Sequence, residues 1–155
     1  MSAPAPSPLA SRLDELSEDE CRLLLSLSAV GRVAFVVDGL PVVFPVNYRL
    51  LNDESGLWIV LRTRLGNAID AAPEQVAFEI DGLDHDRKEG WSVLVRGVIH
   101  HLDHNEVELL NQRFDPKPWP QQDESSWLAI KPTLITGRRV RGTDWEWELS
   151  SDAYL

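Results

Sequence analysis

The chain has 155 residues, an apolar fraction of 43% and a formal net charge of −10. This length suits one domain that buries its own core. The acidic balance argues against nucleic acids and anionic membrane surfaces as partners, because both attract basic proteins. No apolar run approaches the roughly 20 residues that span a bilayer. The single cysteine, Cys21, cannot close an internal disulfide, so we expect a reducing, cytoplasmic setting in which Cys21 is a buried apolar side chain.

The chain opens with a stretch rich in proline, alanine and serine, which predicts a disordered lead-in over residues 1–15. A helix is predicted next, over Leu16–Ser28. Ser17 and Glu20 have the spacing of a capping box, and apolar residues then recur at helical spacing.

A hairpin is predicted over residues 29–50. Two β-rich runs, 33–37 and 42–46, are separated by Asp38-Gly39, a pair typical of tight hairpin turns. Pro45 lies inside the second run and predicts an edge position or a bend, since proline cannot donate to a strand ladder. A second turn is expected at residues 52–56.

Three apolar runs in the middle of the chain predict strands: Leu57–Leu61, Gln75–Ile80 and Trp91–Val98. The first two are separated by a polar turn, Arg62–Asn67, and a helix-compatible stretch, Ala68–Ala72. A charged loop over residues 81–89 separates the second run from the third.

The C-terminal part begins with a helix of about ten residues that Asp103 can cap. Residues 115–120 carry three prolines and predict no regular element. Residues 127–130 and 133–140 predict two closing strands, interrupted by Pro132. The acidic tail begins at residue 143.

These short strands and brief helices indicate a mainly β domain, a six- to seven-stranded antiparallel barrel over residues 16–149 with a tail at 150–155.

The turn after the strand at Leu57–Leu61 is the place where the residues themselves suggest a ligand. Arg62, Thr63 and Gly66 lie where a strand is expected to end and a helix to begin. Free N–H groups and the helix dipole favour an anion there, and guanidinium groups bind phosphate bidentately. The alternative is that Arg62 and Arg64 are solvated loop charges.

Three histidines in one short stretch, His100, His101 and His104, superficially suggest a metal site. Adjacent strand residues face opposite sides, so only one of His100 and His101 can join His104, and we expect no metal. Arg96 shares a strand face with Ser92 and needs a carboxylate, a ligand or solvent; Glu79 is the expected partner.

Six segments in this order resemble the pyridoxamine 5′-phosphate oxidase-like proteins of the flavin-binding split-barrel fold. They are LSEDECRLLL, GRVAFVVDGLPVVFPVNYRL, LWIVLRTRLGN, VAFEID, GWSVLVRGVIHHL and LAIKPTLITGRRV. The resemblance covers residues 16–140 and implies a split barrel that dimerises, with flavin mononucleotide (FMN) bound between the subunits.

The resemblance also assigns cofactor-binding residues. One segment lies along the isoalloxazine ring, a strand end and turn hold the phosphate, another strand meets the cofactor from the partner side, and a closing stretch borders the pocket. In that order these are Pro45, Val46, Asn47 and Tyr48; Leu61, Arg62, Thr63, Gly66, Asn67 and Ala68; Trp91 and Ser92; and Thr136, Gly137 and Arg138.

One departure from the family pattern bears on the cofactor. Relatives carry a Gly-Thr-Lys-like segment where this chain has Gly66-Asn67-Ala68, so a lysine near the phosphate is missing. Weaker flavin binding, a deazaflavin or an empty site are each compatible with this change. The expected function is a flavin-dependent oxidoreductase with a nicotinamide or other electron donor. The alternatives are a non-catalytic module that binds flavin, deazaflavin or haem, and a cofactor-free dimeric scaffold. No catalytic residue is assigned; Tyr48 is the best candidate by position, and packing explains it equally well.

Overall fold

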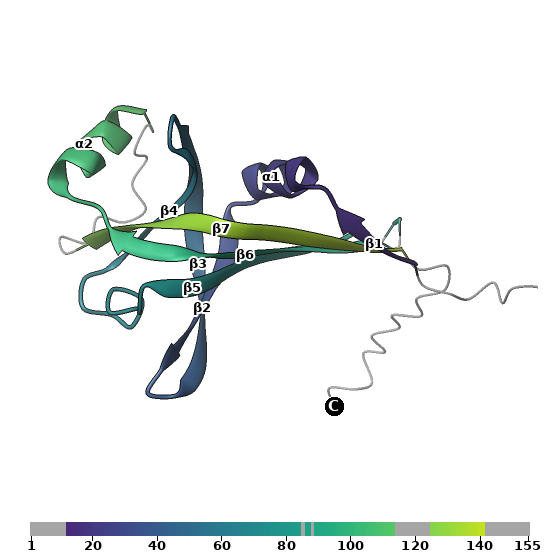
Figure 1. Cartoon of the computed structure of the whole chain (residues 1–155), viewed down its shortest axis with the longest axis horizontal. Coiled ribbons are helices and arrows are strands. Elements are labelled where there is room, and N and C mark those ends of the chain that lie inside the picture. Colours follow the sequence, from purple (N-terminus) through teal and green to yellow (C-terminus); the bar gives the residue numbers. More distant parts are fainter. Residues whose placement is uncertain (1–11, 85, 88, 114–124, 142–155) are drawn as a thin grey trace, which may run out of the picture.

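The computed structural model describes residues 12–84, 86–87, 89–113 and 125–141 (Figure 1). It contains seven strands and two helices in the described residues. In chain order they are β1 (Arg12–Leu16), α1 (Glu18–Leu27), β2 (Val30–Val37), β3 (Leu40–Asp53), β4 (Gly56–Arg64), β5 (Gln75–Asp84), β6 (Glu89–His101), α2 (His104–Arg113) and β7 (Ser125–Arg141).

The strands form one antiparallel sheet in the order β1-β7-β4-β3-β2-β5-β6, which closes because β6 also pairs with β7. Two strands change partner along their length. β7 pairs with β6 on one side, and on the other side with β4 over residues 125–130 and with β1 over residues 137–141. β3 pairs with β2 over residues 40–47 and with β4 over residues 48–53. The predicted antiparallel split barrel is therefore confirmed.

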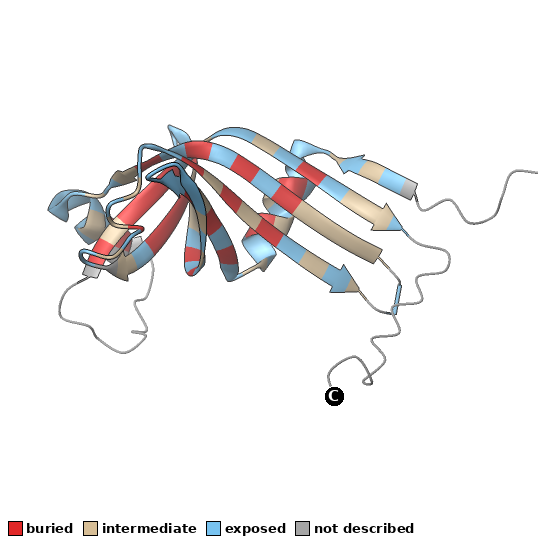
Figure 2. Ribbon diagram, turned by 90° about the horizontal axis from the view of Figure 1, so that it is seen from below, coloured by how far each residue is buried: buried red, intermediate tan, exposed pale blue. Residues whose placement is uncertain are grey.

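Buried and exposed residues alternate along the strands, so each strand turns one face to the barrel interior (Figure 2). α1 packs against this core through Cys21 and Leu25, both fully buried. α2 covers a second, smaller cluster on the outer face of the sheet, formed by Val60, Leu110 and Ala129.

Local signals in the sequence located several elements correctly. Ser17 caps α1 and completes the capping box with Glu20, and Asp103 and Glu106 exchange the same pair of hydrogen bonds at the start of α2. Asp38 and Gly39 have positive φ angles of 50° and 78°, as a tight hairpin turn requires.

The edge position predicted for Pro45 is also confirmed. It pairs with Arg32 of β2, whereas the pairing of β3 with β4 begins only at Tyr48. The missing N–H of Pro45 therefore costs the barrel no ladder hydrogen bond on the open side.

Four expectations about element boundaries are wrong. Residues 12–15 belong to β1 and not to a disordered lead-in, and Leu16 ends this strand instead of starting the helix, because all five pair with β7. Residues 81–84 and 89 extend β5 and β6, so the charged loop is shorter than expected. β7 is one strand, and Pro132 is accommodated by a register shift opposite Arg96 and Gly97. Residues 1–11, 115–120 and 142–155, for which a lead-in, an irregular segment and a tail were expected, lie outside the described residues.

The fourth correction concerns the turn after β4. Residues 62–64 continue that strand and pair with β7. None of residues 68–72 is helical, and residues 68–71 form hydrogen-bonded turns. A five-residue stretch ending at Pro73 is too short to repay helix nucleation.

Candidate functional site

The residues assigned by resemblance fall into two groups within one protomer. The first lies on β3, β4 and the turn after β4, where Leu61 pairs with Leu128 of β7. The second lies on β6 and β7, where Ser92 pairs with Arg138. Leu128 and Arg138 are ten positions apart on one strand, which is roughly 33 Å at 3.3 Å per residue. One compact ligand cannot contact both groups of the same protomer.

In the first group, only some side chains face outward. Pro45 and Asn47 are exposed, whereas Val46, Tyr48 and Leu61 are buried in the barrel core. The buried three can offer a ligand only their backbone groups. The open edge of β3 over residues 45–47 makes such groups available, because β4 does not pair there.

Tyr48 has the surroundings of a packing residue. It is 2% exposed, its hydroxyl donates a hydrogen bond to the Leu25 carbonyl at 2.6 Å, and its ring meets the Phe78 ring edge-on. Burial raises the pKa of Tyr48 to about 12. A general-acid role for this hydroxyl therefore has no geometric support.

Arg62 and Thr63 lie on opposite faces of β4, because strand residues alternate. The exposed Arg62 guanidinium lies over the ring of Trp127, its cross-strand partner, with Cζ 5.6 Å from the ring centroid. The Thr63 hydroxyl faces the turn and accepts a hydrogen bond from the Asn67 amide. The side chain of Arg64 lies outside what the structure describes.

Three of the backbone N–H groups expected to be free for a phosphate are already bonded within the chain. Asn67 Oδ1 accepts from Ile69 N–H and Asp70 N–H at 3.0 and 2.9 Å. The Asp70 carboxylate accepts from Gly66 N–H at 2.8 Å. Asp70 thus places an internal negative charge in the turn where an external anion was expected, while Ala68 is exposed.

Asp70 also joins this turn to the strands behind it. His101 Nε2 lies 2.9 Å from Asp70 Oδ1, and the buried Ser126 bonds the same carboxylate. The hydrogen bonds from Gly66, Ser126 and His101 lower the pKa of Asp70 to about 2. The sequence analysis did not single out Asp70. Its position three residues after Asn67 was the one local feature that could have pointed to it.

The second group lies beside β1 and α1. A Cβ atom on Gly137 would lie 2.5 Å from Cys21 Sγ, so glycine allows α1 to pack on β7. Trp91 and Ser92 are half-buried, and Thr136 and Arg138 are exposed. Trp91 packs against the barrel core, so Ser92, Thr136 and Arg138 are the assigned side chains that this end of the barrel offers to a partner or ligand.

The two strand histidines contact an aromatic ring and a carboxylate. The ion pair expected between Arg96 and Glu79 is not the one that Glu79 forms. His100 packs edge-on against Trp58, with ring centroids 5.3 Å apart, whereas His101 faces Asp70 on the opposite side, as alternation predicted. Glu79 pairs with Arg32 at 3.0 Å instead of with Arg96.

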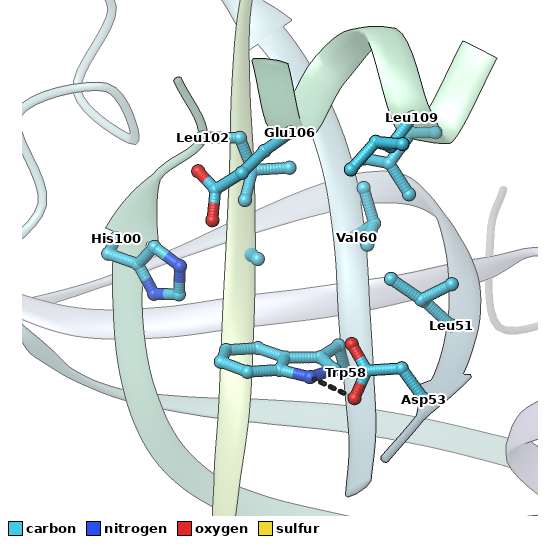
Figure 3. A pocket seen from close by; sticks show the side chains of 10 residues that line it. Leu51, Asp53, Trp58, Val60, His100, Leu102, Glu106 and Leu109 are labelled. Carbon is cyan, nitrogen blue, oxygen red and sulfur yellow. Dashed lines mark hydrogen bonds between the residues drawn. The ribbon is translucent and has the colours of Figure 1, made fainter. Parts of the chain in front are cut away.

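A pocket of about 170 Å³ lies between α2 and the outer face of the sheet (Figure 3). Sequence analysis missed it, because contacts between α2 and distant strands create it. Six apolar residues and four polar or aromatic ones line it: Leu51, Val60, Leu102, Leu109, Leu110 and Ala129, with Asp53, Trp58, His100 and Glu106.

Comparison with known proteins identifies the class. The sequence model of the pyridoxamine 5′-phosphate oxidase family matches residues 17–139. The chain belongs to this family, whose flavin-binding members share its split-barrel fold.

Individual relatives give the finer comparison. The chain is 33% identical over 142 residues to the uncharacterized protein Rv0080 of Mycobacterium tuberculosis, covering 86% of this chain and 90% of that protein. The solved FAD-binding protein of Mycobacterium smegmatis is 37% identical, with a TM-score of 0.70 over 83% of this chain and 98% of that one. An FAD-binding protein of Mesorhizobium loti, 22% identical with a TM-score of 0.65, covers 84% of this chain and 98% of its own and shows the shared fold.

No helix among the described residues is long and apolar enough to cross a membrane.

Proposed function

We propose that the protein is a flavin-dependent oxidoreductase that works as a homodimer, with each flavin bound between two subunits. The observation that carries this proposal is the separation of the two groups of assigned residues, roughly 33 Å along β7, in a chain of a flavin-binding family. A two-fold dimer brings the β3–β4 group of one subunit against the β6–β7 group of its partner.

Within such a site, the chain's residues would divide the work. The open edge of β3 at residues 45–47 offers backbone groups to the polar edge of the ring, and Arg62 offers a guanidinium to a phosphate. Ser92, Thr136 and Arg138 would contact the cofactor from the other subunit. The flavin supplies the redox chemistry, with a nicotinamide or another donor as the source of electrons.

The turn after β4 bears on which flavin we expect to bind. FMN ends in a phosphate monoester that needs N–H donors and cations, yet Asp70 occupies the Gly66 N–H and Ala68 carries no charge. The FAD-binding protein that is 37% identical also favours FAD. We therefore expect FAD to bind more tightly than FMN, and deazaflavin to be the next candidate. Cys21, a buried thiol, suits the cytoplasmic location proposed with this function.

Purification followed by an absorption spectrum and titration with FAD, FMN and a deazaflavin tests the cofactor. Sedimentation at micromolar concentration tests the dimer, and bleaching of the flavin bands by NADH or NADPH without oxygen tests the redox role. Bound flavin that no donor reduces would favour the non-catalytic binding module. A dimer that binds none of the three cofactors would favour the cofactor-free scaffold.

A further inference from the structure

The pocket under α2 combines an apolar interior with two lining carboxylates. Leu102, Leu110 and Ala129 belong to the apolar lining, and the Trp58 indole forms one side of the pocket in Figure 3. Apart from His100, the ionisable residues among the described part of the lining are Asp53 and Glu106. Such a site favours a ligand with an apolar body and a positive charge.

We propose that this pocket binds a small aromatic ammonium ion, of the size of 2-phenylethylammonium. A cavity of about 150 Å³ holds benzene, so the volume of about 170 Å³ admits one ring with a short side chain. The inference depends on this pocket alone and does not require flavin binding.

A cation of the chain already lies against the indole that forms this wall. The Lys131 ammonium group lies 5.0 Å from the centroid of the Trp58 ring, within the range of a cation–π interaction. A ligand ammonium would meet the same indole together with the Glu106 carboxylate, which also lines the pocket. The Trp58 indole N–H donates to Ser55 Oγ at 2.9 Å and, at the longer distance of 3.3 Å, to Asp53 Oδ1, so the ring edge lies beside that carboxylate.

Glu106 is the carboxylate best suited to contact the ligand. Its Oε2 accepts the Asp103 N–H at 2.8 Å, which holds the side chain at the first turn of α2. In Figure 3 its carboxylate extends toward the side on which His100 lies. An ammonium N–H bonded to such a carboxylate is a charge-assisted contact, which a neutral hydroxyl cannot equal.

Calorimetric titration of the full chain with 2-phenylethylammonium chloride tests the proposal, with neutral 2-phenylethanol and anionic phenylacetate as probes of the same shape. The ammonium ion is expected to bind about tenfold more tightly than the alcohol, and phenylacetate more weakly than both. Equal affinities for ammonium ion and alcohol would overturn the charge argument, and no saturable binding of the ammonium ion would overturn the site.

Two matched pairs of variants locate the binding. Leu109→Trp fills the pocket, while Leu23→Trp makes the same change on α1; the two leucines are 60% and 58% exposed. The first should reduce ammonium affinity about tenfold or more and the second less than about twofold. Equal effects would place the ligand elsewhere.

The second pair removes one charge from α2. Glu106→Gln keeps a residue that capping boxes accept and should weaken the ammonium ion but not the alcohol. Glu108→Gln, on the same helix outside the pocket lining, should change neither. If Leu109→Trp does not fold, the two glutamate variants decide the question. Equal changes of ammonium affinity in Glu106→Gln and Glu108→Gln would overturn the proposal. Ammonium binding without flavin binding would contradict only the proposed function; flavin binding without ammonium binding would contradict only this inference.

Discussion

The two halves of β7 have different neighbours on the same strand. Over residues 125–130 it lies between β4 and β6, and its outer face leaves a pocket under α2. Over residues 137–141 it lies between β1 and β6, and α1 packs directly on Gly137. Ion pairs close this second half, as Arg139 faces Glu20 at 3.7 Å and Arg141 faces Glu89 at 3.2 Å.

The two halves of β7 therefore differ in what their neighbours contribute, since one half is tightly packed and the other borders a pocket. The closed half is held by close packing, where an added methyl group meets sulfur and carbon atoms. The open half keeps aromatic and charged side chains beside unfilled space, which a ligand can use. Substitutions at the packed positions of the closed half should therefore act on folding, and substitutions of side chains that face the open space should act on ligand affinity.

The largest effect is expected at Gly137. Gly137→Val would place Cβ 2.5 Å from Cys21 Sγ and 3.0 Å from Leu16 Cδ1, so α1 must move away from β7. We expect the free energy of unfolding to fall by about 3 kcal/mol, measured by urea denaturation. The smaller change Gly137→Ala should be partly rescued by Cys21→Ala, which removes the sulfur. Additive losses in the double variant would mean that another contact limits this position.

Asp70 should show the next largest effect, because it joins the turn after β4 to the open half of β7. Asp70→Asn removes a carboxylate that is 13% exposed and bonded to Gly66, Ser126 and His101. We expect a loss of about 2 kcal/mol at pH 7. Asp86→Asn, in the exposed β5–β6 turn, is the control and should change little.

The pH dependence of that loss has a definite sign. The pKa of Asp70 is about 2 in the folded protein against an ordinary 3.8, so its contribution is complete above the ordinary value. It is lost as the pH falls through the folded pKa. The difference between the parent protein and Asp70→Asn should therefore shrink as urea titrations move from pH 5 toward pH 3. A difference that stays constant over this range would mean that the carboxylate charge does not stabilise the turn.

Arg62 lies on the open side, so its change should appear in affinity. Arg62→Ala is expected to weaken FAD and FMN binding about tenfold, the loss of one charge-assisted contact. Arg87→Ala, a change at an exposed arginine of the β5–β6 turn, is the matched control. Titration monitored by flavin fluorescence measures both variants. Unchanged affinity in Arg62→Ala would show that its guanidinium serves only the contact with Trp127.

The sequence predicted those parts of the molecule that depend on near neighbours. Ser17 and Glu20, Asp38-Gly39, and Asp103 carry their structural signals within four residues, and each element formed where expected. The strand at residues 62–64 and the continuity of β7 across Pro132 depend on pairing with distant strands. Local patterns therefore favoured a turn and a break there.

The candidate site was predictable only in part for the same reason. The resemblance named residues 45–48 and 61–68, but alternation along a strand decided which of their side chains face outward. The Asp70 network and the pocket under α2 arise from contacts between segments more than 20 residues apart, such as Asp70 with His101 and Leu110 with Val60. Nothing in the local pattern around these residues distinguishes them from ordinary surface or core positions.

The smallest effect is expected at Ala68, which lies in the same turn as Asp70 and is exposed. Ala68→Lys would place an ammonium group beside the Gly66–Asp70 hydrogen bond, where the family carries its lysine. A phosphate monoester carries nearly two negative charges, so the new cation should add about 1 kcal/mol and tighten FMN several-fold.

Riboflavin, which has no phosphate, should be nearly unaffected, and FAD should gain less than FMN. Parallel titrations of parent and variant with the three flavins separate these outcomes. Equal gains for FMN and riboflavin would mean that the lysine acts through packing. If no ligand responds, position 68 does not face the phosphate. The assignment of position 68 by resemblance would then be wrong.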